Sequence, residues 1–217
     1  EYNDSINTIY TVNRCINLES NSETRQLLYS KILYPIFGIT SNMQDNAPQY
    51  GLMRHMLHKL ARAIAGHYTD KNWFLFIGER NSGKGVITGL IKNAFGDYIG
   101  TTDSNYFKAA DMVSDPGRTN GWMMQFMYKR LAIANEVVVR RKNDHLDGNI
   151  IKKFISGGDE IIGRELYGKE INFKVQATLL IACNDEPEIK PSDANETRIS
   201  FFMKSKFVAE SDINNPD

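Results

Sequence analysis

The chain has 217 residues and carries no formal net charge, because 26 Lys and Arg side chains balance 26 Asp and Glu side chains. With 41% hydrophobic and 24% charged residues, its composition is that of a globular protein and excludes a disordered one. A neutral chain has no averaged field that attracts a polyanion, so contact with nucleic acid would depend on a few locally placed cations.

Cysteine usage and apolar runs exclude further classes. Cys15 and Cys183 are too few and too far apart for a disulfide framework or a metal knuckle, which favours a reducing compartment. The longest apolar stretches have the length of strands and are too short for a membrane span, so we expect a soluble chain without membrane contact. It begins at Glu1 without a secretory signal, and we expect it to be part of a longer protein.

The N-terminal part is predicted to be helical. Residues 1–21 show no periodic pattern and stay unassigned. Apolar residues then recur at helical spacing from Ser22 until Pro35, and an amphipathic segment runs from Gly51 to Gly66. We place a boundary near His67, where this pattern ends.

After this boundary the pattern predicts a buried sheet. Three short apolar runs of strand length are separated by segments long enough for helices: Trp73–Ile77, Leu131–Ala134 and Thr178–Cys183. Such spacing indicates βαβ crossovers and a largely parallel sheet. Three further elements are expected: a helix over Asp147–Ile155, a hairpin or extended loop over Gly157–Phe173, and a last strand over Ile199–Phe207.

The sharpest motif follows the first of these strands and precedes a helical run, Val86–Phe95. It has the G-x-x-x-x-G-K spacing, in which backbone N–H groups wrap phosphates and the helix N-terminus adds its dipole. Lys84 is expected to reach the β- and γ-phosphate oxygens of ATP, although a plain glycine-rich turn is the alternative. The predicted phosphate site consists of Gly78, Glu79, Arg80, Asn81, Ser82, Gly83, Lys84, Gly85 and Val86.

One position departs from this motif. Gly85 stands where Ser or Thr normally gives its hydroxyl to Mg²⁺. Thr88, Ser82 or a water molecule could take that place, and the sequence leaves the choice open.

Polar residues follow three of the predicted strands. Glu136 is the expected catalytic base and Mg²⁺ ligand through water, unless it is a solvated strand-end glutamate; Asn135 beside it replaces a second acid. Asn184 could hydrogen-bond the γ-phosphate or the attacking water, or simply form a turn. Arg198 could neutralise transition-state charge, including in a neighbouring subunit, or form a surface salt bridge.

In combination these motifs resemble superfamily 3 helicases, and most nearly the primase–helicases of large DNA viruses of the poxvirus, asfivirus and mimivirus kind. The likeness covers about residues 50–207. The residues that carry it, in chain order, are Gly78 to Lys84, Asn135-Glu136, Ser156-Gly157-Gly158-Asp159 with Arg164, Lys169 and Phe173, and then Asn184 and Arg198.

This resemblance implies an α/β fold, namely an AAA+-like P-loop ATPase core with a parallel sheet, a β-hairpin insertion and a helical N-terminal part. The implied division is a helical oligomerisation or collar region at 1–67, the ATPase core at 68–207 and a tail at 208–217. Lys84 and Glu136 would form the ATPase site, with Asn184 as sensor and Arg198 as an arginine finger acting in trans.

The hairpin is the implied contact with single-stranded DNA, with Lys169 near its tip. The residues themselves agree, because Tyr167 offers a stacking face and Lys169 a charge for phosphate. The alternative is an exposed hairpin with ordinary surface residues.

The expected function is that of an ATP-driven, Mg²⁺-dependent helicase motor of viral DNA replication. As the resemblance implies, it acts as a homo-oligomeric, hexameric ring, with a primase region on the same full-length polypeptide, at replication sites in the host cytoplasm. The main alternative is a nucleotide-binding scaffold with weak ATPase activity, because Gly85 and Asn135 both remove a customary magnesium contact. A P-loop small-molecule kinase is the lesser alternative.

Overall fold

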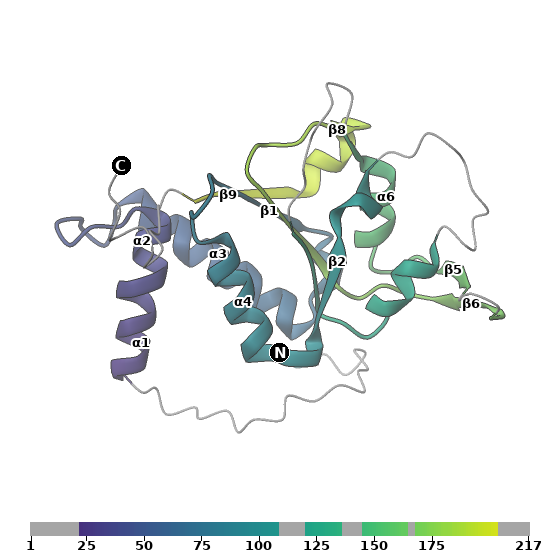
Figure 1. Ribbon diagram of the computed structural model, residues 1–217, viewed down its shortest axis with the longest axis horizontal. Coiled ribbons are helices and arrows are strands. Elements are labelled where there is room, and N and C mark those ends of the chain that lie inside the picture. Colours follow the sequence, from purple (N-terminus) through teal and green to yellow (C-terminus); the bar gives the residue numbers. More distant parts are fainter. Residues whose placement is uncertain (1–21, 109–119, 136–144, 165–167, 204–217) are drawn as a thin grey trace, which may run out of the picture.

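The computed structural model of the chain describes residues 22–108, 120–135, 145–164 and 168–203, and the structural statements below refer to these residues (Figure 1). Its centre is a five-stranded parallel sheet with the strand order β2-β3-β7-β1-β9. The strands are β1 (Trp73–Ile77), β2 (Ile99–Asp103), β3 (Leu131–Asn135), β7 (Thr178–Cys183) and β9 (Arg198–Phe202). The earliest strand therefore lies between the two latest, and elements far apart in sequence meet at the centre of the sheet.

Every residue of β1 and β7 is buried, because both faces of the sheet are covered. Alternate residues of β1 enter two separate cores: Trp73 and Leu75 face one, and Phe74 and Phe76 the other. A strand covered on both faces is apolar throughout. This burial explains why these two strands are recognisable as continuous apolar runs.

The sequence pattern missed β2 because it lies at the edge of the sheet and is half polar. A side chain is excluded at Gly100, where an added Cβ would lie 2.4 Å from the Phe126 ring. Two other short strands, β4 (Leu146–Asp147) and β8 (Ile189–Lys190), form a parallel pair that is too short to leave a periodic pattern.

The N-terminal helices follow the prediction with two corrections. The first helical segment does not end at Pro35: α1 (Ser22–Leu28) continues through a π-helical turn (Tyr29–Leu33) into α2 (Tyr34–Phe37). Proline is tolerated there because it occupies the second position of α2, where an N–H has no α-helical partner.

The second N-terminal helix starts earlier than expected. It is α3 (Pro48–Ala65), which begins at Pro48 rather than Gly51 because proline suits the first position of a helix. It ends at Gly66, as predicted, where a φ of 90° favours glycine.

Helices cover both faces of the sheet. α3 and α4 (Lys84–Phe95) contribute to the core that contains Phe76 and Phe201. α6 (Gly148–Ile155) and a 3₁₀ helix (Gly121–Phe126) contribute to the core on the opposite face.

The predicted hairpin is confirmed as β5 (Ile161–Arg164) paired antiparallel with β6 (Glu170–Phe173). Figure 1 shows it projecting from the body of the molecule at the end opposite α1. The last strand was expected over 199–207 and is observed over Arg198–Phe202, while residues 204–207 lie outside the described part. Among the described helices, none combines the length and apolar character that a membrane crossing needs.

Candidate functional site

The glycine-rich loop lies at the carboxyl edge of the sheet. It connects the end of β1 to the start of α4, and the Gly78 N–H donates to the Cys183 carbonyl oxygen of the adjacent strand β7 at 3.3 Å. Parallel strands place their carboxyl ends at one edge, which is where ligands of open α/β sheets bind. The loop thus occupies the expected place for a site.

The backbone of this loop leads into a helix start that no side chain caps. Asn81 and Gly83 both have positive φ values, 64° and 92°. Gly83 is the N-cap of α4, and no side chain caps this helix. The first N–H groups of a helix have no partner within the helix and attract negative charge.

Glycine is required at one end of the loop and optional at the other. A Cβ added at Gly78 would lie 2.5 Å from Ser82 Oγ and 2.8 Å from the Met203 carbonyl oxygen. At Gly85, by contrast, a Cβ would have no heavy atom within 4 Å. The absence of a hydroxyl at position 85 is therefore not imposed by space.

The Lys84 ammonium lies inside the loop. Nζ donates to the carbonyl oxygens of Gly78 at 2.5 Å and Glu79 at 2.9 Å, and to Ser82 Oγ at 3.2 Å. An ammonium has three donors, and three loop oxygens hold it beside the uncapped start of α4. The donor set of this cradle, amides plus one cation, fits a chain of phosphates.

Both hydroxyls considered as replacements for Gly85 are buried and engaged. Thr88 Oγ1 donates to the carbonyl oxygens of Lys84 and Gly85 at 3.1 and 3.2 Å. Ser82 Oγ accepts from Lys84. The described residues contain no group of three or more His, Cys, Asp or Glu that could hold a metal ion, and Glu136 lies outside them, so Mg²⁺ binding stays a prediction.

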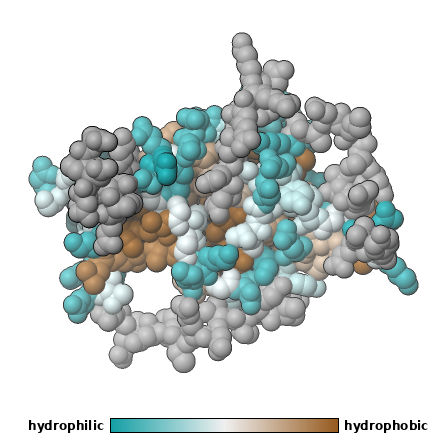
Figure 2. All heavy atoms as spheres, viewed as in Figure 1, coloured by the Kyte–Doolittle hydropathy of each residue, from teal (hydrophilic) through white to brown (hydrophobic). Residues whose placement is uncertain are grey.

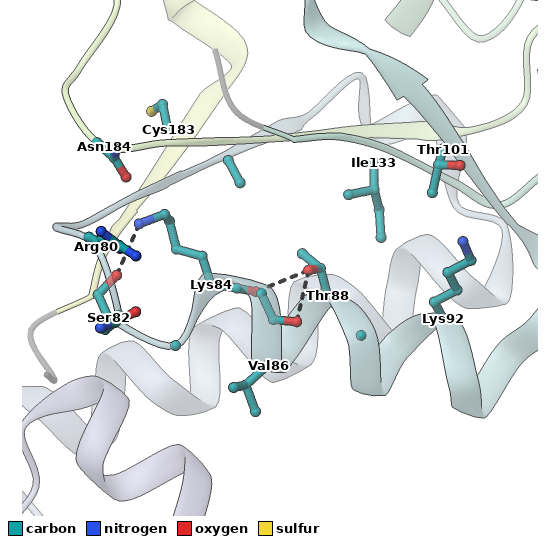
Figure 3. Close-up of a pocket in the computed structure, with 15 residues that line it drawn as sticks. Arg80, Ser82, Lys84, Val86, Thr88, Lys92, Thr101, Ile133, Cys183 and Asn184 are labelled. Carbon is teal, nitrogen blue, oxygen red and sulfur yellow. Dashed lines mark hydrogen bonds between the residues drawn. The ribbon is translucent and has the colours of Figure 1, made fainter. Parts of the chain in front are cut away.

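A cleft of about 790 Å³ opens at the loop (Figure 3). This volume lies within the range of small-molecule and cofactor sites. Asn184, directly after β7, lines the same cleft as Lys84. The structure therefore brings most of the predicted phosphate loop and the predicted sensor together. Residues 80–86 line the cleft, whereas Gly78 and Glu79 are not among its lining residues.

The cleft also contains residues that were not predicted. Lys92 on α4 and Thr101 on β2 line its far end, away from the loop (Figure 3). Lys92 lies eight residues after Lys84, close to the same helix face. This spacing could have predicted that both residues line one cleft. Thr101 gave no signal because β2 was not recognised as a strand.

Cys183 lies beside the loop with its thiol buried. Burial raises the pKa of the Cys183 thiol to about 12, although the nearby Lys84 charge acts in the opposite direction. The thiol donates weakly to the Phe76 carbonyl oxygen at 3.7 Å. It is a small packing group, as a free buried cysteine usually is.

Two predicted site residues in the described part of the chain, Arg198 and Lys169, are not among those that line the cleft. Arg198 pairs in register with Trp73, at the strand end opposite the loop, and its guanidinium binds the Glu186 carboxylate at 2.6 Å. Lys169 is exposed beside β6 and is not among the residues that line the cleft. Glu136 and Tyr167 lie outside the described residues.

Comparisons with known proteins agree with this architecture. Residues 76–198 match a family described as a family of unknown function, DUF5906. A Sputnik virophage protein named as a helicase, V13, is 33% identical over 158 residues; the match covers 71% of this chain and 20% of that protein. The chain thus spans about a fifth of the length of this curated relative.

Two solved structures have the same fold. The C-terminal region of NrS-1 superposes with a TM-score of 0.57 at 18% identity, over 86% of this chain and 42% of that one. JCV helicase gives a TM-score of 0.51 at 13% identity, over 85% of this chain and 52% of that one.

These matches confirm the α/β fold with its parallel sheet and the resemblance to viral helicases. The assignment to superfamily 3 stays a prediction. The narrower likeness to the poxvirus, asfivirus and mimivirus kind stays a prediction.

Proposed function

Because this chain belongs to the DUF5906 family and resembles a viral helicase in sequence and fold, we propose that it is the ATP-hydrolysing motor of a nucleic-acid helicase. The observation that carries the proposal is the shared cleft of the phosphate loop and Asn184 at adjacent strand ends. Neither element alone is specific, but their junction at the carboxyl edge of a parallel sheet is typical of nucleotide-hydrolysing enzymes.

Within this cleft the chain's own groups have distinct roles. The amides of the loop and the Lys84 ammonium neutralise the negative charge of the phosphates, which grows on the transferred group in the transition state. The Asn184 side chain, on the next strand, hydrogen-bonds the terminal phosphate or the attacking water. When bound, Mg²⁺ would supply further charge neutralisation, with Glu136 as the proposed ligand and base.

Arg198 is proposed to act on a neighbouring subunit. Its backbone lies at the strand end opposite the loop, and Arg198 is not among the residues that line the cleft of its own chain. The Glu186 contact holds the guanidinium in a defined orientation. An arginine held outside its own site suits a finger that completes an adjacent one.

The hairpin is the proposed contact with single-stranded DNA. Lys169 is exposed beside a projecting pair of strands, and Tyr167 precedes it in the same connection. We extend the proposal to a hexameric ring, to a primase region elsewhere on the polypeptide, and to action at viral replication sites in the host cytoplasm. These belong to the whole protein, of which this chain covers a part.

A nucleotide-binding scaffold with weak ATPase activity is the second candidate. Gly85 favours it, because position 85 has space for a hydroxyl and yet lacks one. The Lys84 ammonium also binds three oxygens of its own loop. Both features suit a site that holds phosphate with little turnover.

ATP hydrolysis measured with and without single-stranded DNA separates the two candidates. We expect activity that DNA stimulates and that Lys84→Ala reduces by at least about a hundredfold, because the loss of one preorganised charge-stabilising donor has that order of effect. Lys190→Ala is the matched control, since its ammonium lies away from the cleft and forms an exposed ion pair with Glu188. Nucleotide binding by an assembled wild type that does not hydrolyse ATP would instead establish the scaffold.

A further inference from the structure

A second hollow lies among the N-terminal helices, between the α1–α2 segment and α3. We call it the tyrosine groove; its volume is about 720 Å³. Figure 1 shows α1 and α2 at one end of the long axis of the molecule and the β5–β6 hairpin at the other. The described residues that line the groove are Arg25, Gln26, Tyr29, Ser30, Tyr34, Asp45, Tyr50, Met53 and Arg54.

Pro35 explains how two of these tyrosines come to share one wall. Proline has no N–H, so it cannot donate to the Lys31 carbonyl oxygen, and its ring would clash with that carbonyl in a regular α-helix. The helix opens instead into a π-turn, in which the Tyr34 N–H donates to the Tyr29 carbonyl oxygen five residues back.

The π-turn changes which side chains meet. In a regular α-helix, residues five apart point about 140° away from each other. Here the Tyr29 and Tyr34 rings approach to 5.8 Å between centroids, in an edge-to-face contact. Single π-turns inside helices occur frequently at functional sites, where they aim side chains.

The third ring comes from the facing helix. Tyr50, in the first turn of α3, meets Tyr34 edge-to-face at 5.6 Å. Tyr50 is buried, whereas Tyr29 and Tyr34 are partly exposed. The buried ring fixes Tyr34, and the two outer rings present aromatic surface to the groove.

Two guanidinium groups accompany the rings. The Arg25 guanidinium lies 5.7 Å from the centroid of the Tyr29 ring. Arg54, on α3, is exposed and makes no ion pair with another residue in the described ranges. Asp45 also lines the groove, so the two guanidinium groups outnumber its single carboxylate. Because the chain has no net charge, this local excess of positive charge favours an anionic ligand.

We propose that the tyrosine groove is a second binding site for single-stranded nucleic acid, in which bases pack against Tyr29 and Tyr34 while Arg25 and Arg54 contact phosphates. Aromatic faces combined with cations bind single strands with little sequence preference. The choice of this ligand rests on the proposed function. A proline-rich peptide, which also uses aromatic-lined grooves, is the competing occupant.

The first test measures binding of a fluorescent oligothymidine by anisotropy, without ATP, to the full chain. Tyr29→Leu should weaken binding about five- to tenfold, whereas Tyr29→Phe, which keeps the ring, should bind as the wild type does. Arg54→Gln should lower the slope of log K against log salt by about 0.7, the value for one phosphate contact on a single strand. The matched control is Lys59→Gln, which removes one charge from the same helix outside the groove.

The second test locates the contact. An oligonucleotide that contains 5-bromodeoxyuridine should photo-crosslink to a peptide with Tyr29 or Tyr34, as identified by mass spectrometry. Three results would each overturn the proposal. The first is unchanged binding by Tyr29→Leu and Arg54→Gln, and the second is crosslinks confined to the hairpin. The third is displacement of the DNA by a proline-rich peptide that binds more tightly.

The experiments distinguish a failure of the proposed function from a failure of the proposed nucleic-acid site in the tyrosine groove. If the chain lacks ATPase activity but the groove variants bind DNA more weakly, the proposed function fails and the groove stands. If DNA stimulates the ATPase and the groove variants bind normally, the groove fails and the function stands. Thermal unfolding of each variant checks that it is folded.

Discussion

Cys183 illustrates how a single residue at a site can be chemically inert. It ends β7 and lines the cleft, yet its side chain is 1% exposed. Desolvation disfavours the thiolate, which is the reactive form of cysteine. A reactive role for this residue is therefore disfavoured, although it lies close to Lys84.

We expect native Cys183 to resist alkylation at pH 8. Its folded pKa of about 12 lies above the ordinary 9.0, so the thiol stabilises the fold below pH 9, and this contribution is lost as the pH rises towards 12. Iodoacetamide labelling of a Cys15→Ser variant, followed by intact mass, should show modification in urea and none in buffer. Rapid labelling of the folded variant would contradict the buried assignment, and Cys15→Ser/Cys183→Ser gives the background.

At the scale of elements, α4 positions the site through its first turn. The loop fixes the helix start at Gly83, and the helix then places Lys84 inside the loop and Lys92 at the far end of the cleft. The open space at Gly85 makes this turn a place where a side chain can be added without a clash.

We expect Gly85→Ser to tighten Mg²⁺ binding and so to lower the Mg²⁺ concentration that ATP hydrolysis needs. A hydroxyl at position 85 supplies the ligand that this loop lacks, so half-maximal ATPase activity should need on the order of tenfold less Mg²⁺, as for other groups that tune metal affinity. Gly89→Ser is the control, because position 89 also lines the cleft on α4 and has equally open space. Equal effects of both substitutions would indicate a general gain in helix stability.

At the scale of the whole molecule, one sheet joins two cores. Phe201 of β9 packs with Phe74 and Phe76 on the face that also holds Met56 of α3. Phe154 of α6 packs on the opposite face. One continuous core therefore extends across the predicted boundary near residue 67. We propose that the parts on either side of this boundary unfold together.

We expect Phe154→Ala and Phe201→Ala each to lower the free energy of unfolding by about 3–5 kcal/mol, because both rings are fully buried. Leu27→Ala, at a side chain that is 52% exposed, should change it by less than about 0.5 kcal/mol. Urea unfolding followed by tryptophan fluorescence and by circular dichroism should give coincident single transitions. Separate transitions would show that the helical part and the α/β part are independent domains.

The local sequence pattern was sufficient to predict much of the fold. The runs at β1, β3 and β7 are apolar because both faces of each strand are buried, and Gly66 marks a helix end because its φ is positive. The glycine-rich loop was recognisable because the phosphate binding predicted for it depends on consecutive residues. These features share one physical property, which is that neighbouring residues alone specify them.

Only the tertiary structure decided which residues from distant segments of the chain lie together. Strand order places Asn184 beside the loop and Arg198 at the opposite strand end, and the edge position of β2 brings Thr101 into the cleft. The sequence by itself determined the glycine-rich loop between a strand and a helix, and the elements that have a clear local period, but not β2, β4 or β8. It did not determine which residues share a cleft or a groove, because those contacts depend on packing between elements that no local period records.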